Sequence, residues 1–148
     1  MNLQERLLED MKAAMKSKEK ERLSVIRMAR AAIKDVEIDQ RKDLDDDEII
    51  EVLASIVKKN KESLAEYEKA ENEEKVAKLK KEIEIIQEYL PEQLNEEELN
   101  EIVDETISEV EAEDMSDMGQ VMGKIMPKVK GRADGSKVNQ LVRARLGS

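Results

Sequence analysis

The chain of 148 residues carries a net charge of -10, with 42% charged and 1% aromatic residues, a composition that disfavours a β-sandwich or barrel built on aromatic and β-branched side chains. Nowhere does it contain the run of about 18 apolar residues that a membrane span requires. It has neither His nor Cys, which excludes a thiolate nucleophile, an imidazole base, a usual zinc site and a disulfide.

Apolar residues at helical spacing predict two helices in the first 41 residues. The first lies near residues 2–16, and Ser17 is the expected N-cap of the second, which runs to about Arg41. The acidic run at residues 43–47 favours the start of a further helix through capping bonds and the helix dipole. The expected buried stripes are Leu3, Leu7, Leu8, Met11, Ala14 and Met15, and then Leu23, Ile26, Ala29, Ile33 and Val36.

Two heptad-spaced stripes predict a long antiparallel helical hairpin near residues 46–70 and 73–89, because the short connection makes the two helices neighbours. Asn60 lies within the first stripe. It either fixes the register of the hairpin or sits at the edge of the seam, facing water. The stripes are Ile50, Leu53, Val57, Asn60, Leu64 and Tyr67, and then Val76, Leu79, Ile83, Ile86 and Leu90.

Pro91 marks the expected boundary between two helical domains, residues 1–90 and residues 95–148, because proline cannot continue the preceding helix. Asn95 is placed to cap the next helix, and Glu98 stands three residues on, as in a capping box. The stripe of this helix is Leu99, Ile102, Val103, Thr106 and Val110.

Two more helices are predicted in the C-terminal part of the chain. One starts at Ser116 or Asp117, and Pro127 must kink or end it. The other follows a turn at residues 131–136, with Asp134 as its candidate N-cap. The expected buried residues are Met118, Val121, Met122, Ile125 and Val129, and then Val138, Leu141, Val142 and Leu146.

Gly119 and Gly123 have some similarity to a phosphate loop, but the spacing is one residue short, and Ile125 replaces the residue that would hold magnesium. We therefore expect them to pack, one turn apart on a helix, against another backbone. The methionines around them either fill gaps in a small core or form an adaptable binding surface. They are Met115, Met118, Met122 and Met126.

The charge is unevenly placed: residues 1–42 carry +3, residues 43–118 carry -19 and residues 119–148 carry +6. The basic C-terminal segment suits a polyanion. The alternative is that acidic and basic segments neutralise each other in the fold, or that the charges are solvated helix faces.

Residues 126–136 are a candidate phosphate-contact segment. They place Lys128, Lys130 and Arg132 beside two glycines and a new helix N-terminus, whose free N–H groups attract anions. Contacts of this kind hold a phosphate without reading sequence. The alternative is a charged linker capped by Asp134.

Three runs of the sequence carry a resemblance to a known family. They are residues 89–94 (YLPEQL), 117–136 (DMGQVMGKIMPKVKGRADGS) and 138–142 (VNQLV). The chain resembles the YqeY-like proteins, which share this unit with the C-terminal tail of the B subunit of the tRNA-dependent aspartyl/glutamyl amidotransferase.

The resemblance implies an all-α protein, with an N-terminal helical domain that contains the long hairpin and a small C-terminal three-helix domain. It also implies a tRNA-associated role, because the tail of the amidotransferase B subunit helps to hold tRNA while the chemistry occurs elsewhere. The motif residues matched are Pro91, Gly119, Gly123, Pro127, Gly131, Asp134 and Gly135. The expected RNA-binding residues are Lys124, Lys128, Lys130, Arg132, Lys137, Arg143 and Arg145.

Three functions compete. The first is a non-catalytic tRNA-binding protein or an accessory to a tRNA-modifying or aminoacylation enzyme, and the second is an adaptor whose acidic hairpin meets a basic protein. The third is an amidotransferase-like carbon–nitrogen ligase with glutamine as amido donor, for which Thr106 and scattered serines and carboxylates show no pairing into a nucleophile and base. We expect a cytoplasmic protein with no catalytic residue, metal, cofactor or membrane partner, and the sequence does not indicate its oligomeric state.

Overall fold

The computed structural model describes residues 1–147 and contains only helices and connecting segments within them, so the expected all-α class is confirmed. The chain forms two compact units, Met1–Leu90 and Pro91–Ser148. None of the described helices is long and apolar enough to cross a membrane.

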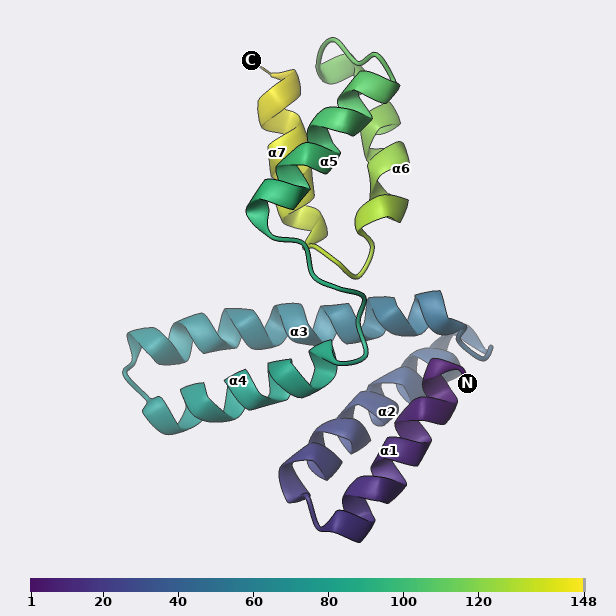
Figure 1. The fold of residues 1–148 in the computed structure, drawn as a ribbon, viewed down its shortest axis with the longest axis vertical. Helices are drawn as coiled ribbons and strands as arrows, with labels where there is room; N and C mark the ends of the chain where they lie inside the picture. The colour runs from purple at the N-terminus through teal and green to yellow at the C-terminus, as the bar shows by residue number, and fades with distance from the viewer. Residues whose placement is uncertain (148) are drawn as a thin grey trace. The chain divides into compact units, whose positions relative to one another are not determined.

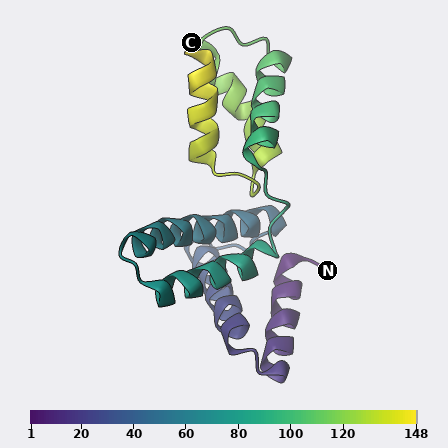
Figure 2. The same ribbon diagram turned by 60° about the vertical axis from the view of Figure 1, so that its left-hand side comes forward.

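The first unit consists of four helices (Figure 1). They are α1 (Leu3–Ser17), α2 (Lys20–Gln40), α3 (Asp46–Lys69) and α4 (Glu73–Gln87). In two views α1 lies beside α2, and α3 lies beside α4 across a short turn (Figures 1 and 2). Because α2 also contacts α3 and α4, the two helix pairs share one core.

Side chains at the helix starts explain why these segments become helical where they do. The Asp45 carboxylate accepts from the backbone N–H of Glu48, whose own carboxylate accepts from the N–H of Asp45, so the acidic run begins α3 with a full capping box. The prediction of Ser17 as a cap is wrong. Ser17 is the last residue of α1, Lys18 turns the chain with a φ of 59°, and Glu19 precedes α2 without a side-chain capping bond.

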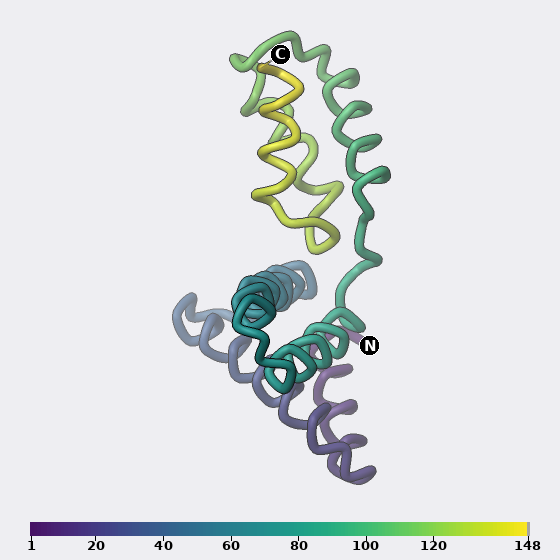
Figure 3. The backbone as a smooth tube through the Cα atoms, turned by 90° about the vertical axis from the view of Figure 1, so that its left-hand side faces the viewer, coloured from purple at the N-terminus to yellow at the C-terminus, as the bar shows by residue number. Residues whose placement is uncertain are grey.

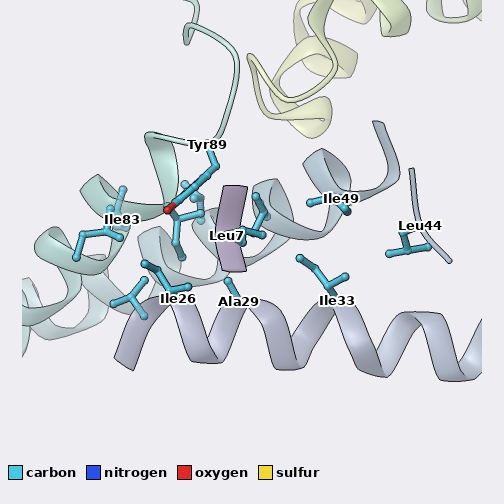
Figure 4. Close-up of a cluster of buried hydrophobic side chains, with 13 residues drawn as sticks. Leu7, Ile26, Ala29, Ile33, Leu44, Ile49, Ile83 and Tyr89 are labelled. Carbon is cyan, nitrogen blue, oxygen red and sulfur yellow. The ribbon is translucent and has the colours of Figure 1, made fainter. Parts of the chain in front are cut away.

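The core of the first unit is aliphatic except for Tyr89 (Figure 4). Leu53 and Val57 are buried as expected, but Ile49 rather than Ile50 is the fully buried residue in the first turn of α3. Met15, expected in the stripe of α1, is half exposed. The core residues are Leu7, Val25, Ile26, Ala29, Ile33, Leu44, Ile49, Leu53, Val57, Ile83, Ile85, Ile86 and Tyr89.

Asn60 agrees only in part with the two alternatives from the sequence, a register-fixing residue in the seam or a residue at its edge that faces water. Its side chain is partly buried, and its Nδ2 atom is shielded from water without a hydrogen-bond partner among the described residues. The expectation that the amide faces water is therefore wrong for Nδ2. An unpaired buried donor of this kind costs about 1–3 kcal/mol.

The second unit consists of three α-helices and a single 3₁₀ turn, which Figure 3 follows as a backbone tube. The elements are α5 (Glu96–Glu109), η1 (Met115–Asp117), α6 (Met118–Val129) and α7 (Gly135–Leu146). Its core residues are Leu99, Val103, Val121, Ile125, Val129, Val138, Val142 and Leu146.

Three caps fix the boundaries of these helices. The predicted box of Asn95 and Glu98 is present, and Asp134 accepts from the N–H of Ser136 at 3.0 Å, as expected for the cap of α7. Helix α6 begins at Met118, one residue after the predicted Asp117, which is its N-cap without a side-chain capping bond. Asp114 caps the 3₁₀ turn that precedes it.

The two helical glycines do not pack as predicted. Gly119 and Gly123 are exposed on α6, and no heavy atom of a neighbouring side chain or backbone in the described chain lies within 4 Å of where a Cβ would stand. The helix passes through Pro127 and ends two residues later, at Val129. Among the methionines, Met118 and Met122 pack against the core as the gap-filling alternative predicts, while Met115 and Met126 are exposed.

Candidate functional site

The segment after Leu90 is tied to the loop between α6 and α7. The backbone N–H of Leu94 donates to the carbonyl of Arg132 at 2.9 Å, and the Gln93 side-chain amide donates to the carbonyl of Gly131 at 2.7 Å. Gly131 has a φ of 73°, a left-handed conformation that glycine adopts without strain. Two of the runs that carry the family resemblance thus form one structural element.

Arg132 holds this element together. Its guanidinium donates from Nε to the carbonyl of Glu92 at 3.1 Å and from Nη1 to the carbonyl of Lys128 at 3.4 Å. The second bond satisfies a carbonyl at the C-terminal end of α6, where cations are favoured. A phosphate contact by Arg132 would have to replace or share these bonds.

Lys128 is paired inside the second unit. Its ammonium lies 3.1 Å from a carboxylate oxygen of Glu109 and 3.0 Å from the hydroxyl oxygen of Thr106, both on α5. Thr106 is fully buried, and its hydroxyl donates to the carbonyl of Ile102 at 2.7 Å. Thr106 is therefore a structural residue of α5, shielded from any substrate in solution.

Two cations of α7 also meet carboxylates of α5. Lys137 lies 3.0 Å from Glu96, and Arg145 lies 2.8 Å from Asp104. Helix α5 has seven Asp and Glu residues and no Lys or Arg, and its carboxylates neutralise cations of α6 and α7. Mutual neutralisation of acidic and basic segments therefore accounts for part of the charge pattern.

Lys124 and Arg143 differ from these three cations. Both side chains are exposed, and neither has a hydrogen bond or ion pair within the described part of the chain. Lys130 is partly buried at the C-cap of α6. The seven expected RNA-binding residues thus divide into two uncommitted cations, three cations paired with α5, and the two loop residues Lys130 and Arg132.

The N-terminus of α7 already holds an anionic group. The Asp134 carboxylate accepts from the N–H of Ser136, which is one of the donors that a phosphate would use. Gly135 is partly buried, and a Cβ there would lie 3.5 Å from the Cε atom of Met126, an ordinary contact. This helix end is capped from within the chain.

A network around Tyr89 was not anticipated from the sequence. The Tyr89 hydroxyl donates to the Asp10 carboxylate, and the Arg6 guanidinium lies 4.5 Å from the centre of the ring. Arg22 bonds to both carboxylate oxygens of Glu88 beside it. Burial and the bond to Asp10 raise the pKa of Tyr89 far above its ordinary value of 10.0.

This network closes the core of the first unit at the end of α4. The side chains that meet there come from α1, α2 and the residues just after α4. The only available sequence signal was that Tyr89 opens the first run of the family resemblance, whereas its partner Asp10 lies 79 residues earlier. Tyr89 therefore fixes the end of the first unit.

Within residues 1–147, no group of three or more Asp or Glu side chains is placed to hold a metal ion. In the second unit, Glu98, Asp114 and Asp117 take part in capping boxes, and Glu96 and Glu109 form ion pairs.

Comparison with known proteins agrees with the resemblance seen in the sequence. A stretch of 84 residues is 38% identical to the protein "Altered inheritance of mitochondria protein 41, mitochondrial" of Kluyveromyces lactis. The match covers 56% of this chain and 45% of that relative, so the chain spans less than half of the relative's length. Residues 4–146 match the family described as Yqey-like protein, from the start of α1 to the end of α7. The chain belongs to the YqeY-like protein family.

Proposed function

We propose that this protein is a non-catalytic tRNA-binding protein, or an accessory to an enzyme that acts on tRNA. The observation that carries the proposal is the basic segment from α6 to α7, where residues 119–148 hold seven Lys and Arg against one Asp. Within it, Lys124 and Arg143 are exposed and uncommitted. The resemblance of this unit to the tail of the amidotransferase B subunit points to tRNA as the polyanion.

Energetics allow the paired cations to contribute as well. The ion pair of Lys137 and Glu96 is solvent-exposed, and such pairs contribute about 0–1 kcal/mol. A phosphate can therefore replace Glu96 at little cost. Arg132 is different, because removing it from the Glu92 carbonyl would break part of the loop structure. We expect Lys124, Arg143 and Lys137 to contact RNA before Arg132 does.

The proposed role is non-catalytic because the sequence shows no pairing of a candidate nucleophile with a base. The chain contains no His and no Cys, and Thr106 is buried with its hydroxyl bonded to a carbonyl. Purified protein given glutamine, ATP and misacylated tRNA should show no amide transfer. Turnover above a heat-killed control, abolished by a point substitution in this chain, would overturn this part of the proposal.

An acidic hollow at the end of the α3–α4 hairpin supports the adaptor as a second candidate. Its lining residues are Glu68, Glu71, Glu73, Val76, Ala77 and Lys80. Three carboxylates against one cation, together with two apolar side chains, suit a basic, partly apolar protein segment. An adaptor would bind its partner through this hairpin.

A pull-down with the full chain, analysed for both RNA and protein, separates the two candidates. The tRNA proposal predicts that tRNA is retained at low salt and released as salt rises, because phosphate contacts release counterions. Retention of a basic protein and no RNA, with loss of that protein on substitution of Glu68 and Glu71, would favour the adaptor. We propose a cytoplasmic location for this role, because the absence of cysteine fits a reducing compartment.

A further inference from the structure

A hollow of about 370 Å³ lies against helices α1 and α2 of the first unit. Figure 1 shows these helices side by side. The polar residues that line the hollow are Gln4, Arg27, Arg30, Lys34 and Glu37. Three of the five are cations, although the chain as a whole carries a charge of -10.

The three cations share one face of α2, because residues three and four positions apart are neighbours on a helix. Arg27 and Lys34 are exposed and have no hydrogen bond or ion pair with another described residue. Arg30 is partly buried, and its Nη1 atom donates to the Met11 sulfur at 3.2 Å. A thioether is a weak acceptor, so the charge of Arg30 is not neutralised there.

The carboxylate in the hollow is already occupied. Glu37 accepts from the side-chain amide of Gln4 at 2.7 Å and from the backbone N–H of Leu44 at 3.0 Å. These two bonds, together with the nearby charge of Lys34, lower the pKa of Glu37 below its ordinary value. Three cations against one engaged carboxylate leave the lining with an excess of two positive charges.

This arrangement contrasts with the second unit, where carboxylates of α5 pair with Lys128, Lys137 and Arg145. We propose that the α1–α2 hollow is a binding site for the phosphate groups of an oligophosphate. Arginine side chains present N–H donors in a fork that matches phosphate oxygens. Arg27, Arg30 and Lys34 lie within about 10 Å along α2, so their long side chains can converge on one oligophosphate. The site lies outside the proposed tRNA-binding tail and does not depend on it.

The oligophosphate could be a small molecule or the backbone of an RNA, and the probes distinguish these sources. Inorganic tripolyphosphate is titrated into the full chain by calorimetry at low salt, and a short single-stranded RNA is then added as a competitor. Displacement of tripolyphosphate by the RNA assigns the hollow to an RNA backbone. Binding of tripolyphosphate without displacement assigns it to a small oligophosphate.

The test compares Arg27→Gln combined with Lys34→Gln against Lys78→Gln combined with Lys81→Gln. Both double variants remove two exposed charges that have no partner in the described structure, and Lys78 and Lys81 lie on α4, away from the hollow. The first variant should bind tripolyphosphate about tenfold more weakly or worse, because charge-assisted bonds to phosphate are lost. The second variant should bind as the wild type does.

Amide chemical shifts of α2 residues provide a second readout, since tripolyphosphate should shift them in the wild type and not in the first variant. Absence of binding by the wild type at low salt would overturn the proposal. An equal loss in both double variants would also overturn it, because it would show a response to net charge alone. Lys124→Gln combined with Arg143→Gln should leave the tripolyphosphate-induced shifts of the α2 amides unchanged, so this readout is separate from the outcome of the tRNA proposal.

Discussion

The Arg132 guanidinium donates to the carbonyl oxygen of Glu92 across 40 residues of chain, at a distance of 3.1 Å. The neighbouring backbone bond from Leu94 to Arg132 runs between the same two segments. A residue that the sequence presents as a phosphate ligand therefore also fixes the fold of the second unit. Substitutions at Arg132 test stability as well as RNA binding.

Arg132→Gln should destabilise the second unit by about 1–2 kcal/mol, because two hydrogen bonds to carbonyls are lost or weakened. Denaturant unfolding followed by circular dichroism measures the loss, and amide hydrogen exchange at Leu94 should become faster. Arg143→Gln is the matched control, since that side chain is exposed and unpaired, and its effect should stay within about 0.5 kcal/mol. Equal effects of the two substitutions would contradict the structural role of Arg132.

The register of α3 can be tested at two adjacent residues. Ile49 is fully buried, whereas Ile50 is only partly buried. Ile49→Ala should cost about 2–5 kcal/mol through lost burial and a residual cavity, and Ile50→Ala should cost less. Urea denaturation midpoints of the two variants decide the matter. A larger loss at Ile50 would restore the register expected from the sequence.

Glu37 should make stability depend on pH in the acid range. Its pKa in the folded state is below the ordinary 4.5, so the unfolded state binds more protons and stability falls as pH drops below that value. Glu37→Ala should lower the melting temperature near neutral pH, and its difference from wild type should shrink as the medium is acidified. Melting curves over a pH series test this, and a difference that stays constant would refute it.

Tyr89 should resist ionisation while the protein is folded. Its pKa is raised, so its contribution to stability is complete below the ordinary tyrosine pKa of about 10 and is lost as pH rises above it. In Tyr67→Phe, Tyr89 is the single tyrosine, and tyrosinate absorbance should appear only together with loss of helical circular dichroism. Ionisation near the ordinary pKa with the helices intact would show that Tyr89 is neither shielded nor bonded to Asp10.

Local signals were sufficient to predict many of the helix ends. Asn95 with Glu98, Asp134 and the acidic run around Asp45 act through bonds within three residues, so their caps follow from sequence spacing. Ser17 failed as a cap because Lys18 adopts a left-handed conformation, which lets α1 extend to Ser17 and leaves Glu19 before α2. Such a turn at a lysine has no clear signature in the sequence.

Features that depend on neighbouring helices were less predictable. A heptad pattern read as a seam between two helices does not predict the burial of Ile49 and Ile85. These residues are buried because α3 and α4 also contact α2, which widens the buried face of each helix. Lys137 and Glu96 are paired although they lie 41 residues apart in the sequence. Composition could therefore indicate that acidic and basic segments neutralise each other, but it could not identify which residues pair. For the same reason, the sequence did not separate Lys124 and Arg143 from the paired cations.

The measurement that tests the tRNA proposal most directly is the salt dependence of tRNA binding by fluorescence anisotropy. It compares the full-length wild type, Lys124→Gln with Arg143→Gln, and Lys78→Gln with Lys81→Gln as the charge-matched control. If both cations of the second unit contact phosphates, the magnitude of the log–log salt slope should fall by about 1.4–1.8 in the first variant and stay unchanged in the control. Affinity should fall about equally for different tRNAs, since phosphate contacts do not read sequence. No tRNA binding by the wild type at low salt, or an equal loss of slope in the control, would contradict the account.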